Sequence, residues 1–221
     1  MVFNLAYYTL GVGFREEFCK MLFFLPLIPW LKKENCHHKI LTFASLVGLG
    51  FAIEENFAYF MRSPGDPVIM GRFLTANLLH MFMTGFICYH LTLAFKHGGK
   101  YWDLFTSSFI KMVVAHGVYD FLLSDPKMVQ SGMSFFAMTL LIWLSMRYIQ
   151  LMVHAAPPHH RYVSLTRLFT LILCLTIGIS YLMMSLDIGI IPALKASING
   201  LISSAIFAYM FYREFNEPIA P

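Results

Sequence analysis

Residues 40–61 read ILTFASLVGLGFAIEENFAYFM, an apolar run that ends in two glutamates and an asparagine. A helix that crosses a membrane needs about 20 mostly apolar residues, and this run has that length. Charged groups near the middle of a span cost about 2.5–3.5 kcal/mol each, so they usually face the protein interior and serve a function. The stretch therefore predicts a transmembrane helix that supplies polar groups to an intramembrane site.

The composition of the whole chain agrees with a membrane environment. Its 221 residues are 58% hydrophobic and 13% charged, whereas soluble domains carry about 25% charged residues. We therefore predict an all-α fold, a polytopic transmembrane helical bundle of about seven spans in one integral membrane domain, residues 1–221. The predicted spans are 3–31, 40–61, 69–95, 104–124, 133–154, 165–186 and 189–212. Eight spans result if 3–14 and 18–31 are separate helices.

The basic residues predict an orientation, because Lys and Arg concentrate in cytoplasmic loops. With loop 32–39 inside, the outer side holds only Arg62, Arg72 and Lys127. The inner set is Lys32, Lys33, Lys39, Lys96, Lys100, Arg147, Arg161, Arg167 and Arg213. We expect a multi-pass protein of the cell membrane with its N-terminus outside and its C-terminus in the cytoplasm. These loops account for most of the formal charge of +4, which needs no nucleic acid partner.

The first polar cluster is Arg15-Glu16-Glu17-Phe18-Cys19-Lys20. On a helix Lys20 lies one turn from both glutamates and can neutralise one of them. The other carboxylate is then available as a general base. The same residues could instead form a buried ion pair that only fixes helix packing, although such pairs seldom stabilise a fold.

Three more polar groups lie on later predicted spans. Glu54, Glu55 and Asn56 follow two glycines that allow close helix approach, and position alone does not say which glutamate points inward. His80 lies on a polar face with Asn77 and Thr84, and a lone membrane histidine is more often an interhelical hydrogen-bond partner than a ligand. His116 and Asp120 are four residues apart on one helix face, where the carboxylate can orient the imidazole.

Taken in order, these residues resemble the motifs of the PrsW family of intramembrane proteases. Glu16-Glu17-x-x-Lys20 resembles the family's EExxK motif, and Phe51-x-x-x-Glu55 followed by Asn56 is similar to its second motif. His116-x-x-x-Asp120 is similar to the third, and His80 lies where another helix of the family carries a histidine. The agreement covers a motif-bearing core of about residues 11–123.

The resemblance implies an intramembrane endopeptidase that hydrolyses a single-pass membrane protein resembling an anti-sigma factor. Glu16 or Glu17 would take a proton from water, and Glu55 or His80 would hold that water. His116 and Asp120 would stabilise the oxyanion or protonate the leaving amine. The candidate catalytic residues are Glu16, Glu17, Lys20, Glu55, Asn56, His80, His116 and Asp120.

Two alternatives stay open. No cofactor is preferred, but a zinc-dependent protease is possible. The zinc ligands would then be Glu17, Glu55, His80 and His116. The chain has no HExxH sequence and more carboxylates than histidines at the site, so glutamate chemistry is favoured. An ion- or proton-coupled transporter could use the same groups as a relay, but the inverted repeats typical of transporters are not visible.

Overall fold

The computed structural model describes residues 2–62, 68–155 and 165–198, together with residues 205, 209, 212 and 213. Every regular element in this part of the chain is a helix, which confirms the all-α prediction. The elements are α1 (Val2–Ala6), η1 (Tyr7–Gly13), α2 (Phe14–Phe24), η2 (Leu25–Leu27), α3 (Ile28–Leu31), α4 (His37–Arg62), α5 (Val68–His97), α6 (Lys100–Ser124), α7 (Pro126–Gln130), α8 (Ser134–Ala155) and α9 (Leu165–Ile188).

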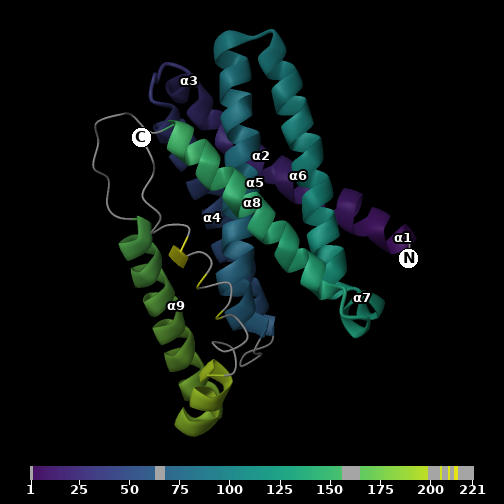
Figure 1. The fold of residues 1–221 in the computed structure, drawn as a ribbon, viewed down its shortest axis with the longest axis vertical. Helices are drawn as coiled ribbons and strands as arrows, with labels where there is room; N and C mark the ends of the chain where they lie inside the picture. Colours follow the sequence, from purple (N-terminus) through teal and green to yellow (C-terminus); the bar gives the residue numbers. More distant parts are fainter. Residues whose placement is uncertain are drawn as a thin grey trace. The chain divides into compact units, whose positions relative to one another are not determined.

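The N-terminal segment is one continuous helical run from α1 to α3 (Figure 1). Residues 15–17, which separate the two pieces of the eight-span alternative, are helical. Pro26 and Pro29 lie in the first turns of η2 and α3, where a missing N–H group is tolerated. The prolines therefore mark changes of helix type and do not end the run.

A π-helix, η1, directly precedes α2. Its turn is wider than that of an α-helix, and π turns in proteins are mostly short and frequent at functional sites. Nothing in the sequence predicted this element. It sets the rotation with which the acidic motif enters α2.

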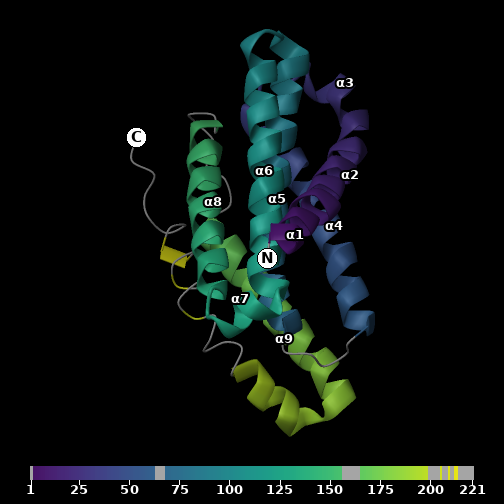
Figure 2. The same ribbon diagram turned by 90° about the vertical axis from the view of Figure 1, so that its right-hand side faces the viewer.

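The chain divides into two compact units, and the first comprises Met1–Ala52 and Leu78–Pro157. In this unit α5 and α6 form an antiparallel pair joined by Gly98 and Gly99. Both glycines have positive φ (64° and 53°), a conformation that other residues rarely adopt. Helix α6 packs against η1, α2 and α8, and Figure 2 shows α1 and α2 crossing this helix pair.

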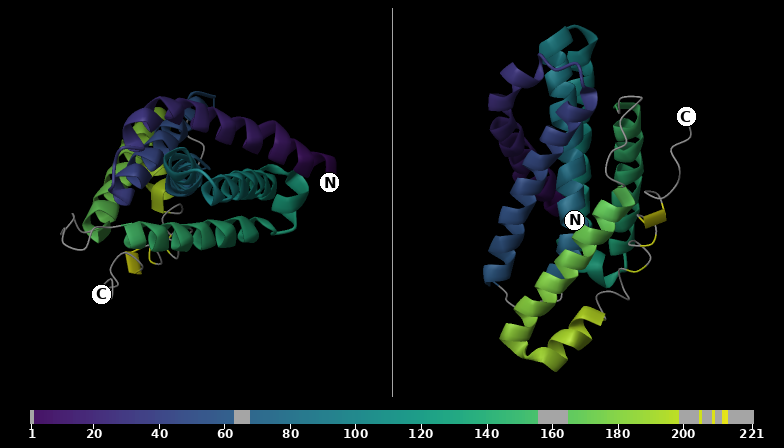
Figure 3. Two further views of the ribbon diagram at one scale, coloured as in Figure 1. Left: turned by 90° about the horizontal axis from the view of Figure 1, so that it is seen from above. Right: turned by 90° about the vertical axis from the view of Figure 1, so that its left-hand side faces the viewer.

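The second unit comprises Ile53–Asn77 and Pro158–Pro221. In this unit α9 ends at Ile188, Gly189 follows with positive φ (87°), and residues 190–198 are again helical (Figure 3). Pro192 lies in the first turn of this last helix, as predicted. The rest of the predicted span 189–212 lies outside the described residues except at three positions.

Three helices of the described part are long and apolar enough to cross a membrane, namely His37–Arg62, Thr75–His97 and Ser134–Ala155. Each of them coincides with a predicted span. Helix α6 has the length but also carries Lys100, Asp103, Lys111 and Asp120. The count of about seven spans stays a prediction.

The short connection between the predicted spans 104–124 and 133–154 contains one short helix, α7. The Asp125 side chain caps this helix by accepting a hydrogen bond from the Lys127 N–H (3.0 Å), a common device at a helix start. Most of the predicted loops 62–67 and 155–163 lies outside the described residues.

Candidate active site

Helix α2 holds the acidic pair and the lysine of the first motif on one face. Lys20 Nζ lies 2.7 Å from Glu17 Oε1 and 3.7 Å from Glu16 Oε2. Lys20 and Glu17 are fully buried, whereas 13% of the Glu16 side chain is exposed. Burying an ion pair is costly unless further hydrogen bonds satisfy both groups. The neighbouring helices supply those bonds.

Helix α6 brings His116 to both glutamates. His116 Nδ1 donates to Glu17 Oε1 (2.8 Å), because a carboxylate in an ion pair only accepts. His116 Nε2 lies 3.6 Å from Glu16 Oε2 and 3.4 Å from Asp120 Oδ2. The imidazole is buried and its ring is held by three carboxylates, so its orientation is well determined.

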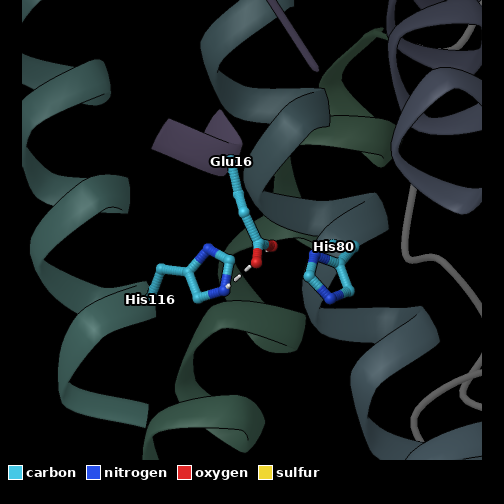
Figure 4. A group of neighbouring side chains, drawn as sticks. All are labelled: Glu16, His80 and His116. Carbon is cyan, nitrogen blue, oxygen red and sulfur yellow. Dashed lines mark ion pairs between the residues drawn. The ribbon is translucent and has the colours of Figure 1, made fainter. Parts of the chain in front are cut away.

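Helix α5 contributes His80, which contacts the lysine. Lys20 Nζ donates to His80 Nδ1 (2.6 Å), since an ammonium has no lone pair with which to accept. The His80 and His116 rings meet edge to face at 5.2 Å. Figure 4 shows Glu16 between the two imidazoles, with each residue on a different helix.

Helix α4 adds Phe51, a residue of the second motif with no predicted chemical role. Lys20 Nζ lies 4.4 Å from the centre of the Phe51 ring, and the His80 ring lies 5.7 Å from it. A ring face at this distance attracts a cation, more strongly where water is excluded. The motif spacing placed Phe51 one turn before Glu55, but its contact with Lys20 depends on how the helices pack.

Glycines at the helix crossings allow these side chains to meet. A Cβ at Gly117 of α6 would collide with the backbone of Thr9 in η1, and one at Gly13 would lie 2.8 Å from the Val113 carbonyl oxygen. A Cβ at Gly48 of α4 would collide with the His80 carbonyl group. Close backbone approach at small residues is a common mode of helix packing in membranes. Gly50, also expected at a close approach, has no neighbour within 4 Å among the described residues.

Glu55 and Asn56 belong to the second unit, where Arg72 holds them. Glu55 Oε1 pairs with Arg72 (2.8 Å), and Asn56 accepts from Arg72 (3.1 Å) and donates to Asn77 (2.8 Å). Glu54 is exposed, so Glu55 is the glutamate with a partner inside the protein. Six of the eight predicted residues thus lie together in the first unit. Glu55 and Asn56 belong to the second unit.

Three groups of the cluster lie close enough together to be candidate ligands of one divalent cation. Glu16, His80 and His116 each offer one ligand atom, and these atoms lie within 4.8 Å of one another. One carboxylate and two imidazoles with room for a water molecule are typical of catalytic zinc sites. The set differs from the predicted ligands, because Glu16 stands in place of Glu17 and Glu55 lies in the second unit. Glu17 instead bonds the far nitrogen of His116, as carboxylates often do behind a metal-binding histidine.

A comparison with protein families matches residues 1–146 to a model described as "PrsW family intramembrane metalloprotease". The chain belongs to the PrsW family. The match covers about two thirds of the 221 residues and includes every helix that contributes to the cluster. No curated protein and no solved structure matches the chain.

Membership in the PrsW family makes the chain an integral membrane protein and a protease. The three long apolar helices agree with this environment. The transporter alternative gains no support from the family. The buried cluster of acids, histidines and lysine is therefore the candidate active site of a PrsW protease.

Proposed function

We propose that the chain cleaves a peptide bond of a single-pass membrane protein with a water molecule activated by Glu16. The observation that carries this proposal is the difference between the two neighbouring glutamates. Glu17 is completely buried and bonded to both Lys20 and His116, so it has no access to water. Glu16 keeps 13% of its side chain exposed and faces the same histidine and lysine.

In the proposed reaction Glu16 takes a proton from water as the water oxygen bonds to the scissile carbonyl carbon. The carbonyl electrons move to its oxygen, and a polar hydrogen from a histidine can stabilise this oxyanion. His80 suits this role, because Lys20 occupies its Nδ1 and the neutral ring then carries its proton on Nε2. The carbon–nitrogen bond breaks as Glu16 returns the proton to the leaving amine.

The other residues of the cluster hold these groups in place. Glu17 fixes the His116 ring through Nδ1, and Asp120 lies beside Nε2 of the same ring. Lys20 lies closer to Glu17 (2.7 Å) than to Glu16 (3.7 Å), so its charge acts mainly on Glu17. Preorganised groups of this kind lower the reorganisation needed during the reaction.

The same donor set could hold a metal ion. Glu16, His80 and His116 would be the ligands, and a bound zinc ion would supply an acidic water and polarise the substrate carbonyl. We favour the metal-free glutamate mechanism over the zinc mechanism. The described cluster contains three carboxylates, and the Lys20 ammonium already supplies a positive charge there.

The distribution of basic residues supports a proposal for the side of the membrane on which cleavage occurs. The loop charges favour a multi-pass protein of the cell membrane with the N-terminus outside and the C-terminus in the cytoplasm. On that orientation we propose that cleavage occurs from the extracytoplasmic side. An anti-sigma-factor-like protein with one transmembrane helix is the kind of substrate that fits, and the lipid bilayer is the other expected partner.

The test is cleavage of single-pass substrates by purified protein in lipid vesicles, with product ends mapped by mass spectrometry. Glu16→Gln keeps the size of the side chain but removes the base, and general-base catalysis contributes about 10²–10⁴-fold. We expect a loss of that size. Glu34→Gln is the matched control, because the Glu34 carboxylate, in the loop after α3, pairs with Lys39 away from the cluster. Cleavage by Glu16→Gln at the normal rate would remove Glu16 from the reaction.

A further inference from the structure

The Lys20 ammonium lies among the same atoms that would bind a metal. Its Nζ is 2.6 Å from His80 Nδ1 and 3.7 Å from Glu16 Oε2, and both residues belong to the candidate ligand group. It is also bonded to Glu17 Oε1 at 2.7 Å, and the Phe51 ring lies 4.4 Å away. The protein thus supplies a cation of its own at the centre of this cluster.

The hydrogen bond to Lys20 has a direct consequence for His80. A metal binds the lone pair of an imidazole nitrogen, and a neutral imidazole has only one such nitrogen. Lys20 donates its proton into the lone pair of Nδ1, so Nε2 carries the ring proton. In this arrangement His80 has no lone pair left for a metal.

His116 is in a different state. Its Nδ1 donates to Glu17, and its Nε2 faces the oxygens of Glu16 (3.6 Å) and Asp120 (3.4 Å). A second cation near Glu16 would also be repelled by the Lys20 charge, and repulsion is strong where water is excluded. With Lys20 in place, the only imidazole lone pair that this ligand group can offer is that of His116 Nε2, when that nitrogen carries no proton.

We propose that Lys20 and a divalent cation exclude one another, so that the lysine withholds His80 from metal binding. Removing the Lys20 charge frees His80 Nδ1 and completes a Glu16–His80–His116 site for zinc. The inference rests on the positions of these groups and does not depend on proteolytic activity, so its test can fail while the proposed function stands.

The first experiment measures zinc binding by the purified, metal-stripped protein in detergent, using calorimetry and metal analysis. Lys20→Met keeps the length of the side chain without its charge, and Lys20→Met/His80→Ala also removes the freed ligand. Lys111→Met is the matched control, because Lys111 is exposed on α6. We expect zinc affinity to rise at least tenfold in Lys20→Met, to fall back in the double variant, and to stay unchanged in the control. Equal affinity of the wild type and Lys20→Met would overturn the proposal.

The second experiment uses only the wild-type chain, in case Lys20→Met does not fold. X-ray absorption spectra of the protein with added zinc count the imidazoles bound to the metal. We expect at most one imidazole, from His116, or no specific binding. Two imidazoles per zinc would show that Lys20 does not withhold His80, and would overturn the proposal.

Discussion

At the residue scale, the fold has to compensate for the buried charge of Lys20, and several neighbouring groups contribute to this. The ammonium is fully buried and contacts Glu17, His80 and the Phe51 ring. A buried charge that loses its partner typically costs 3–5 kcal/mol. The carboxylate supplies most of the compensation, and the aromatic ring adds a smaller part that can be measured separately.

Phe51→Leu keeps an apolar side chain but removes the ring beside Lys20. We expect the free energy of unfolding to fall by about 1–2 kcal/mol, the range of a cation–π contact shielded from water. Phe51→Tyr should lose less, because its ring remains. Thermal or denaturant unfolding in detergent measures the difference. The control is Phe57→Leu on the same helix, where the side chain is 63% exposed; similar losses in both leucine variants would refute a role for the ring.

At the element scale, the crossing of η1 and α6 positions the acidic motif against His116. Gly117→Ala would push a Cβ into Thr9, whose backbone nitrogen would lie 2.7 Å away. Overpacking of this kind costs about 1–3 kcal/mol, and it would also shift α2 relative to α6. We therefore expect lower thermal stability and a marked loss of cleavage.

Gly50→Ala is the matched control for this crossing. It lies in α4 with no neighbour within 4 Å of the added Cβ among the described residues. Replacing glycine by alanine inside a helix gains up to about 1 kcal/mol, so this variant should be as stable as the wild type or more so. If Gly117→Ala behaved in the same way, the close approach of η1 and α6 would be wrong.

A hydrogen bond at the turn between α6 and α7 should make the stability of the fold depend on pH. Asn4 Nδ2 donates to Asp125 Oδ2 (2.7 Å), and this hydrogen bond holds the pKa of Asp125 below its usual range. A carboxyl with a lowered pKa stabilises the fold above its ordinary pKa of about 3.9, and this contribution is lost as the pH falls through the folded value. We expect Asn4→Ala to lower the unfolding temperature at pH 6, and this loss should shrink as the pH falls below the ordinary pKa of the carboxyl group. A loss of the same size at every pH would show that the stabilisation by this hydrogen bond does not depend on the charge of Asp125.

At the scale of the whole molecule, the predicted orientation can be tested with one thiol. Cys36 lies in the loop between α3 and α4, on the predicted cytoplasmic side. In a chain with alanine at the other three cysteines, we expect a membrane-impermeant maleimide to label Cys36 only after the cells are permeabilised. Lys127→Cys in a cysteine-free chain is the control for the outer side and should react in intact cells. The reverse pattern would place the N-terminus in the cytoplasm.

Much of the fold and part of the site could be predicted from the sequence alone. Apolar runs of about 20 residues determine where membrane helices form, because such runs are more stable in lipid than in water. The length of an apolar run is a local property and can be read from the sequence. The predicted boundaries of α4, α8 and α9 therefore agree with the structure to within three residues. Spacings within one helix are also local, so the sequence predicted that Lys20 pairs with one of the two glutamates, and the structure shows that the closer one is Glu17.

Only the tertiary structure decided which groups meet across helices. The π-helix η1 and the glycine crossings set the rotation of α2, and that rotation buries Glu17 while it leaves Glu16 partly exposed. The contacts of Lys20 with His80 and Phe51 join residues 60 and 31 positions apart. No spacing encodes such distances, because they depend on how closely the backbones pack. The sequence by itself determined a membrane helix protein with a PrsW motif set, and the packing decided which of the two neighbouring carboxylates is fully buried.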